Sequence, residues 1–66
     1  MIINLSIGEY DALRMTCKDA EVWCYAAEIP YDKMEIFATQ LEENAPDNDG
    51  KARPYRTLAA RLRRAA

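Results

Sequence analysis

The spacing of apolar residues along the chain predicts mainly helices. The first long apolar stretch follows the alternating three- and four-residue period of one helix face: Tyr10, Leu13, Cys17, Ala20, Cys24 and Ala27. Ser6-Ile7-Gly8-Glu9 fits a capping box, which places the start of this helix near residue 7. The residue before a proline avoids helical dihedral angles, so Pro30 ends the element. The pattern therefore predicts one helix over about 7–29.

A strand within the same stretch is the alternative. Val22, Trp23 and Tyr25 favour extended structure, which predicts a short strand near 21–27. The longer helical periodicity favours the helix, and the alternative stays open. Before residue 7, apolar and polar residues alternate over too few positions to predict a full strand, so we expect a short extended N-terminal segment.

Two more helices follow. Asp32 and Glu35 suit the N-cap and N3 positions of a helix over about 31–44, which has an i, i+3, i+4, i+7 stripe: Met34, Phe37, Ala38 and Leu41. Turn-forming residues after Asn44 predict a loop over 45–53. Pro54 suits the first helical position, so the third helix is expected at about 54–65.

These elements predict an all-α fold, a small three-helix bundle in one domain spanning residues 1–66. An α+β fold with a strand near 21–27 is the alternative. With 66 residues the core is small, and a partner chain would add stability. The first helix has a second apolar stripe: Ala12, Met15, Val22, Ala26 and Ile29. A helix that is apolar on two sides is either central in its own bundle or buried against another copy of the chain, in a homodimer.

Charges are segregated along the sequence. Residues 1–50 hold all 11 acidic residues with only Arg14, Lys18 and Lys33, whereas 51–66 holds the other six of the nine basic residues. Segregation of this kind bears on partners and association rates rather than on fold. It favours a binding role over a catalytic one.

No catalytic, cofactor or metal site is predicted, and we expect no enzyme. The chain has no histidine, and its one serine is the expected cap Ser6. On one helix, Cys17 and Cys24 would be roughly 10 Å apart, too far for a disulfide. The acidic turn 47–50 lacks the glycine and glutamate spacing of an EF-hand.

The acids suggest a partner-binding surface. Carboxylates along a rigid surface can imitate a phosphate backbone and bind the arginines and lysines of a nucleic-acid-binding protein. An ordinary solubilising surface is the alternative. The candidate residues are Glu28, Asp32, Glu35, Glu42, Glu43, Asp47 and Asp49.

The Arg-rich C-terminal helix offers a second candidate surface. Its arginines could bind nucleic-acid phosphate, contact a protein partner, or remain solvated or paired with the chain's own acids. The residues are Arg53, Arg56, Arg61, Arg63 and Arg64. Trp23 and Tyr25 could form an exposed binding anchor, because Trp and Tyr dominate binding hot spots, or part of the core.

The expected compartment is the cytoplasm, with no membrane association. The N-terminus lacks a basic leader, no stretch approaches the roughly 18 apolar residues that span a bilayer, and two cysteines are too few for a secreted disulfide scaffold.

The chain resembles the small phage-encoded anti-CRISPR-type inhibitors in its small size, in the acidic residues named above and in its lack of a catalytic constellation. This resemblance implies a non-enzymatic inhibitor that binds a basic, nucleic-acid-handling bacterial protein or ribonucleoprotein complex and blocks access to nucleic acid. The basic tail departs from a wholly acidic mimic. A small nucleic-acid-binding or regulatory module that uses the C-terminal helix is therefore the alternative function.

Overall fold

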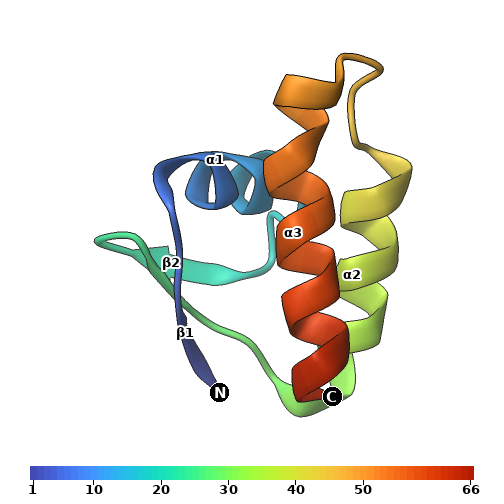
Figure 1. Ribbon diagram of the computed structural model, residues 1–66. Coiled ribbons are helices and arrows are strands. Elements are labelled where there is room, and N and C mark those ends of the chain that lie inside the picture. Colours follow the sequence, from blue (N-terminus) through green and yellow to red (C-terminus); the bar gives the residue numbers. More distant parts are fainter.

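The computed structural model describes residues 1–66 and contains three α-helices and a small three-stranded antiparallel sheet (Figure 1). In chain order the elements are β1 (Ile2–Asn4), α1 (Ile7–Thr16), β2 (Glu21–Trp23), β3 (Ala26–Glu28), the 3-10 turn η1 (Tyr31–Lys33), α2 (Met34–Glu43) and α3 (Asp49–Ala65). α2 and α3 run antiparallel side by side, and α1 crosses them at the end near their connection. The fold is therefore α+β: the three helices are confirmed, but a purely helical bundle is wrong.

α1 begins where the sequence predicts and ends much earlier. Ser6 Oγ accepts a hydrogen bond from Glu9 N at 3.1 Å, while Ser6 N donates to Glu9 Oε1 at 3.0 Å, so the capping box is present. At Cys17 the backbone leaves the helical region, with φ −109° and ψ 79°. The predicted helix over 7–29 is wrong beyond Thr16, because residues 21–28 pair as strands. This pairing buries Ala26 and Ala27 but leaves Trp23 and Tyr25 exposed.

A tight hairpin replaces the second half of the predicted helix. Trp23 lies opposite Ala26, so only Cys24 and Tyr25 connect β2 to β3. Their φ angles are 44° and 60°, and positive values at both positions characterise the type I′ turn that suits a two-residue hairpin. Such turns usually contain Asn-Gly or Asp-Gly, so this sequence lacks the usual signal. The alternative with a strand near 21–27 describes this region better.

The sheet has the order β1-β3-β2 and buries one face against the helices. Cross-strand partners share a face, and the central row of Ile3, Ala27 and Val22 is buried or packed against the core. The neighbouring residues on each strand therefore point away from the helices: Ile2, Glu28, Glu21, Asn4, Ala26 and Trp23. No helix covers this outer face (Figure 1).

The α2–α3 hairpin largely follows the sequence pattern. η1 and α2 together cover 31–43, close to the expected 31–44, but the predicted cap at Asp32 is wrong: α2 follows Lys33, and no side chain caps it. α3 begins at Asp49, five residues before the expected start, because the Asn48 side chain caps it by accepting from Lys51 N at 3.1 Å. The expected loop 45–53 is correspondingly shorter, and Pro54 lies inside the helix.

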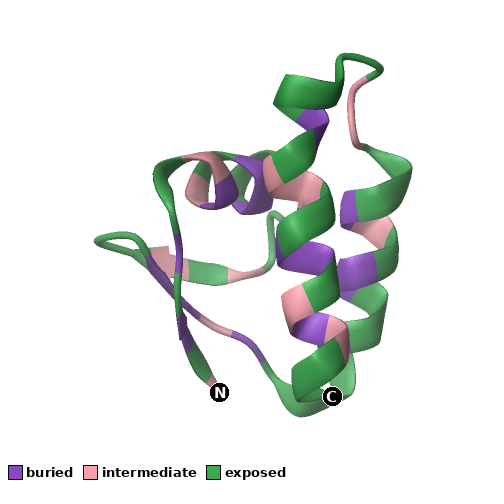
Figure 2. Ribbon diagram, in the orientation of Figure 1, coloured by how far each residue is buried: buried purple, intermediate pink, exposed green.

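The core lies where the three helices face one another and the sheet (Figure 2). Its largest fully buried side chains come from α1, the β3–η1 connection, α2 and α3: Leu13, Ile29, Met34, Leu41, Leu58 and Leu62. Every helix therefore contributes at least one of these side chains, and the apolar stripe predicted for the second helix does face the core.

Gly8 allows α1 to approach α3 closely. A Cβ atom at this position would lie 2.7 Å from Pro54 Cγ and 3.1 Å from Pro54 Cβ. The proline ring is rigid and cannot turn away from such a contact. Gly8 and Pro54 therefore fix the distance at which the two helices cross.

We expect Gly8→Ala to lower the free energy of unfolding by about 1–2 kcal/mol, because overpacking outweighs the better helix propensity of alanine. Urea denaturation followed by circular dichroism measures the change. Gly50→Ala is the matched control: its Cβ would meet only Asn48 Oδ1, at 3.3 Å, and we expect little change. Equal stability of the Gly8→Ala variant and the unmodified protein would contradict the close approach.

Candidate functional site

Arg63 brings part of the basic C-terminal segment against the acids of α2. Because α3 runs antiparallel to α2, Arg63 lies over the acidic face of α2. Its Nε donates to Glu35 Oε1 at 2.9 Å, its Nη1 donates to Glu42 Oε2, and its Nη2 donates to Thr39 Oγ1 at 3.2 Å. The hydrogen bonds to Glu42 and Glu35 hold the pKa of Arg63 above its usual value. Two candidate acids are thus already paired.

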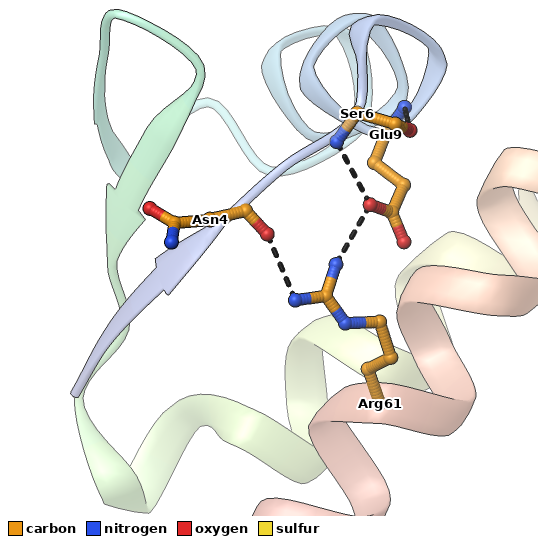
Figure 3. Close-up of polar contacts among 4 residues, drawn as sticks. All are labelled: Asn4, Ser6, Glu9 and Arg61. Atoms are coloured by element: carbon orange, nitrogen blue, oxygen red, sulfur yellow. Dashed lines mark hydrogen bonds and ion pairs between the residues drawn. The ribbon is translucent and has the colours of Figure 1, made fainter.

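Arg61 forms a more buried ion pair on the other side of α3 (Figure 3). Its Nη1 donates to Glu9 Oε1 at 2.7 Å, and its Nη2 donates to the Asn4 carbonyl at 2.8 Å. The Glu9 side chain is only 6% exposed, and its other oxygen, Oε2, is buried without a hydrogen-bond partner. The sequence placed Glu9 in the helix cap, but nothing in its pattern indicated a partner 52 residues away.

The seven candidate acids do not form one surface. Glu28 and Asp32 lie near the start of α2, whereas Glu43, Asp47 and Asp49 lie near its end, about 15 Å away along a ten-residue helix. Glu28 pairs with the N-terminal ammonium at 2.9 Å, and Asp49 approaches Arg56 at 3.7 Å. The candidates that make no ion pair are Asp32, Glu43 and Asp47.

The basic candidates divide in the same way. Arg56, Arg61 and Arg63 each pair with an acid of the same chain. Arg53 and Arg64 are exposed and make no ion pair. Internal pairing, one of the three alternatives for this helix, therefore accounts for three of its five candidate arginines.

The hairpin turn exposes aromatic side chains. Trp23 is 44% exposed and Tyr25 is 52% exposed, so neither belongs to the core. The Tyr25 ring packs edge-to-face on Tyr10 with centroids 4.9 Å apart, and Arg14 lies 5.3 Å from the centroid of Tyr10. The turn is thus supported from α1 while both side chains remain accessible.

The two cysteines lie in contrasting environments. Cys17 is buried, with its Sγ 3.5 Å from Gln40 Oε1, and burial raises the pKa of its thiol to about 11. Cys24 is exposed at the hairpin turn, and neither cysteine forms a disulfide.

The structure contains neither a metal-binding cluster nor a membrane-spanning helix. No group of three or more His, Cys, Asp or Glu side chains is arranged to hold a metal ion, and no helix is both long and apolar enough to cross a bilayer. No protein-family model, curated protein or solved structure matches the chain.

We expect Arg61→Met to lower the free energy of unfolding by about 3 kcal/mol, because it leaves the buried Glu9 carboxylate unpaired. Arg63→Met is the matched control, since its partners Glu35 and Glu42 are partly or fully exposed and regain water. Urea denaturation at low and at high salt measures both variants. Losses of equal size and equal salt dependence would contradict a structural role specific to Arg61.

The thiols are expected to react unequally at pH 8. Cys24 is accessible, whereas Cys17 is buried and remains protonated at that pH, because its pKa is raised to about 11. A thiol–disulfide reagent such as DTNB should therefore titrate one cysteine in the folded protein and both in guanidinium chloride. Rapid reaction of both thiols in the folded protein would contradict the burial of Cys17.

Proposed function

We propose that this chain is a non-enzymatic protein-interaction domain whose contact surface is centred on the hairpin turn at Trp23, Cys24 and Tyr25. The observation that carries the proposal is the left-handed backbone of two non-glycine residues, with φ 44° and 60°, beside exposed aromatic side chains. Left-handed conformations cost roughly 1–2 kcal/mol for each such residue. Strain of this kind often accompanies binding sites.

The aromatic residues suit a hot spot. Trp and Tyr are enriched among the residues whose truncation most weakens protein complexes. They bury a large area when a partner covers them, and their rings lose little conformational entropy. The contact between Tyr25 and Tyr10 supports the turn in the free protein, so less ordering is needed on binding.

The charges near the hairpin favour a basic partner. Glu21 lies directly opposite Glu28 on the sheet, an unfavourable arrangement of like charges that the N-terminal ammonium relieves at Glu28 only. A partner with an apolar pocket would accommodate Trp23, and a basic rim around that pocket would offset the repulsion between Glu21 and Glu28. This chemistry agrees with a phage-type, anti-CRISPR-like inhibitor that binds a basic, nucleic-acid-handling bacterial complex and blocks its access to nucleic acid.

Nucleic-acid binding through α3 is a second candidate function. Arg53 and Arg64 are exposed without an acidic partner in the chain, so both remain available for phosphate. A gel shift with single- and double-stranded oligonucleotides at low salt tests this candidate. Absence of a shift would dismiss it.

We expect Trp23→Ala to weaken binding to the main protein partner by about 30-fold, the effect of losing a hot-spot residue. The partner is first captured from bacterial lysate with the unmodified protein and identified by mass spectrometry. Isothermal titration calorimetry with that purified partner then measures the affinity of each variant, at two salt concentrations.

Two control variants separate the hairpin from general effects. Tyr31→Ala removes an aromatic ring that is 70% exposed outside the hairpin, and its affinity should match that of the unmodified protein. Cys24→Asn eases the left-handed turn while keeping both aromatic residues, so it should gain stability, and its affinity compared with that of Trp23→Ala separates the turn's backbone from its aromatic contacts. Unchanged affinity of Trp23→Ala would overturn the proposal.

A further inference from the structure

We infer that the free edge of β1 and the C-terminal end of α3 form a groove that binds an extended acidic segment of a protein partner by strand addition. This groove lies at the edge of the sheet opposite β2, and it goes beyond the proposed function because it requires a second contact surface. The inference rests on backbone geometry and charge at this edge and does not depend on the hairpin.

The free edge of β1 presents unpaired backbone groups. β1 lies first in the order β1-β3-β2, so only one of its edges is paired. The bonds to the β3 side come from alternate residues: Met1 N donates to Ile29 O, Ile29 N donates to Met1 O, and Leu5 N donates to Tyr25 O, each at 2.8 Å. In an antiparallel ladder the intervening residues point the other way. The N–H and C=O groups of Ile2 and Asn4 therefore face the groove.

The groove has a strand on one side and a helix on the other. Its volume is about 460 Å³, and its lining residues come from the N-terminal segment and from the last turns of α3: Met1, Ile2, Ile3, Asn4, Arg61, Arg64 and Ala65. Ile2 is 66% exposed and offers apolar contact beside the free backbone groups. The groove thus combines an edge for main-chain pairing with a side-chain contact, as strand addition requires.

Arginine gives the groove its preference for acidic segments. Arg61 is already matched by Glu9 and occupies the Asn4 carbonyl, which leaves the Ile2 N–H, the Ile2 C=O and the Asn4 N–H free. Arg64 is exposed and has no acidic partner, so it adds an uncompensated positive charge. A carboxylate on an incoming strand can pair with this guanidinium.

Other occupants fit less well. Two copies joined through β1 would bring their Arg64 side chains toward the same edge, and like charges disfavour that pairing. Nucleic-acid phosphate would meet the Ile2 carbonyl, an acceptor that repels it. An extended peptide matches both the donors and the acceptors of the edge.

Nuclear magnetic resonance titration of the 15N-labelled protein tests the inference. The probe is an acetylated, amidated pentapeptide of alternating glutamate and valine, and its lysine–valine counterpart is the control peptide. We expect the acidic peptide to shift the Ile2 and Asn4 amide resonances and to slow their hydrogen exchange, because these amides gain partners. The lysine peptide should do neither.

Matched variants assign the charge preference. Arg64→Gln should lower the affinity for the acidic peptide about fivefold, which is the usual effect of losing one exposed ion pair. Arg53→Gln removes the same charge from α3 outside the groove and should leave the affinity unchanged. Trp23→Ala should also leave it unchanged, so failure of the hairpin proposal and failure of this one are distinguishable.

Four outcomes would overturn the inference. The first is absence of shifts at Ile2 and Asn4. The second is an equal effect of Arg64→Gln and Arg53→Gln, which would indicate general charge attraction. The third is a concentration-dependent shift of β1 amides without peptide, which would indicate self-association. The fourth is displacement of the acidic peptide by an equimolar oligonucleotide, which would indicate a nucleic-acid site.

Discussion

The contact of Arg61 with Glu9 and with the Asn4 carbonyl joins the three parts of this small fold. One guanidinium at the end of a long helix reaches the start of α1 and the edge of β1, so it fixes the helical hairpin against the sheet. Because the Glu9 carboxylate is buried, separating these elements would leave a charge without a partner. On the same side of the fold, the close approach of Gly8 and Pro54 sets the spacing between α1 and α3.

The antiparallel α2–α3 hairpin brings together charges that are separated along the sequence. The hairpin brings Arg63 to Glu35 and Glu42, and ion pairs with bases of 51–66 engage four of the 11 carboxylates in all. A fifth carboxylate, Glu28, pairs with the N-terminal ammonium. Charge remains available for partners only at scattered positions, such as Asp32 and Arg64. Recognition through a broad acidic surface is therefore less favoured than recognition through small structural features that have a few unpaired charges nearby.

The hairpin turn and the free edge of β1 are two such structural features. At the turn, Cys24 and Tyr25 adopt a left-handed backbone that glycine or asparagine would adopt more easily. This conformation lowers the stability of the fold at the position where aromatic side chains are exposed to solvent. At the β1 edge, Arg61 covers one carbonyl and leaves the neighbouring groups free. A short edge strand partly covered by a charged side chain limits nonspecific aggregation while it still permits pairing with a partner of suitable charge.

Local patterns in the sequence determined the start of α1 through its cap and the position and apolar stripe of α2 through helical periodicity, because both involve residues only a few positions apart. Tertiary structure decided the hairpin, since Val22 and Ala27 pack against the core only when β3 pairs with both neighbouring strands, and the turn lacks glycine. It also decided the roles of Glu9, Arg61 and Arg63, whereas the early start of α3 has a local cause in the Asn48 cap. Those ion pairs span 21 to 52 residues, and no local pattern encodes which elements will lie side by side once the chain has folded.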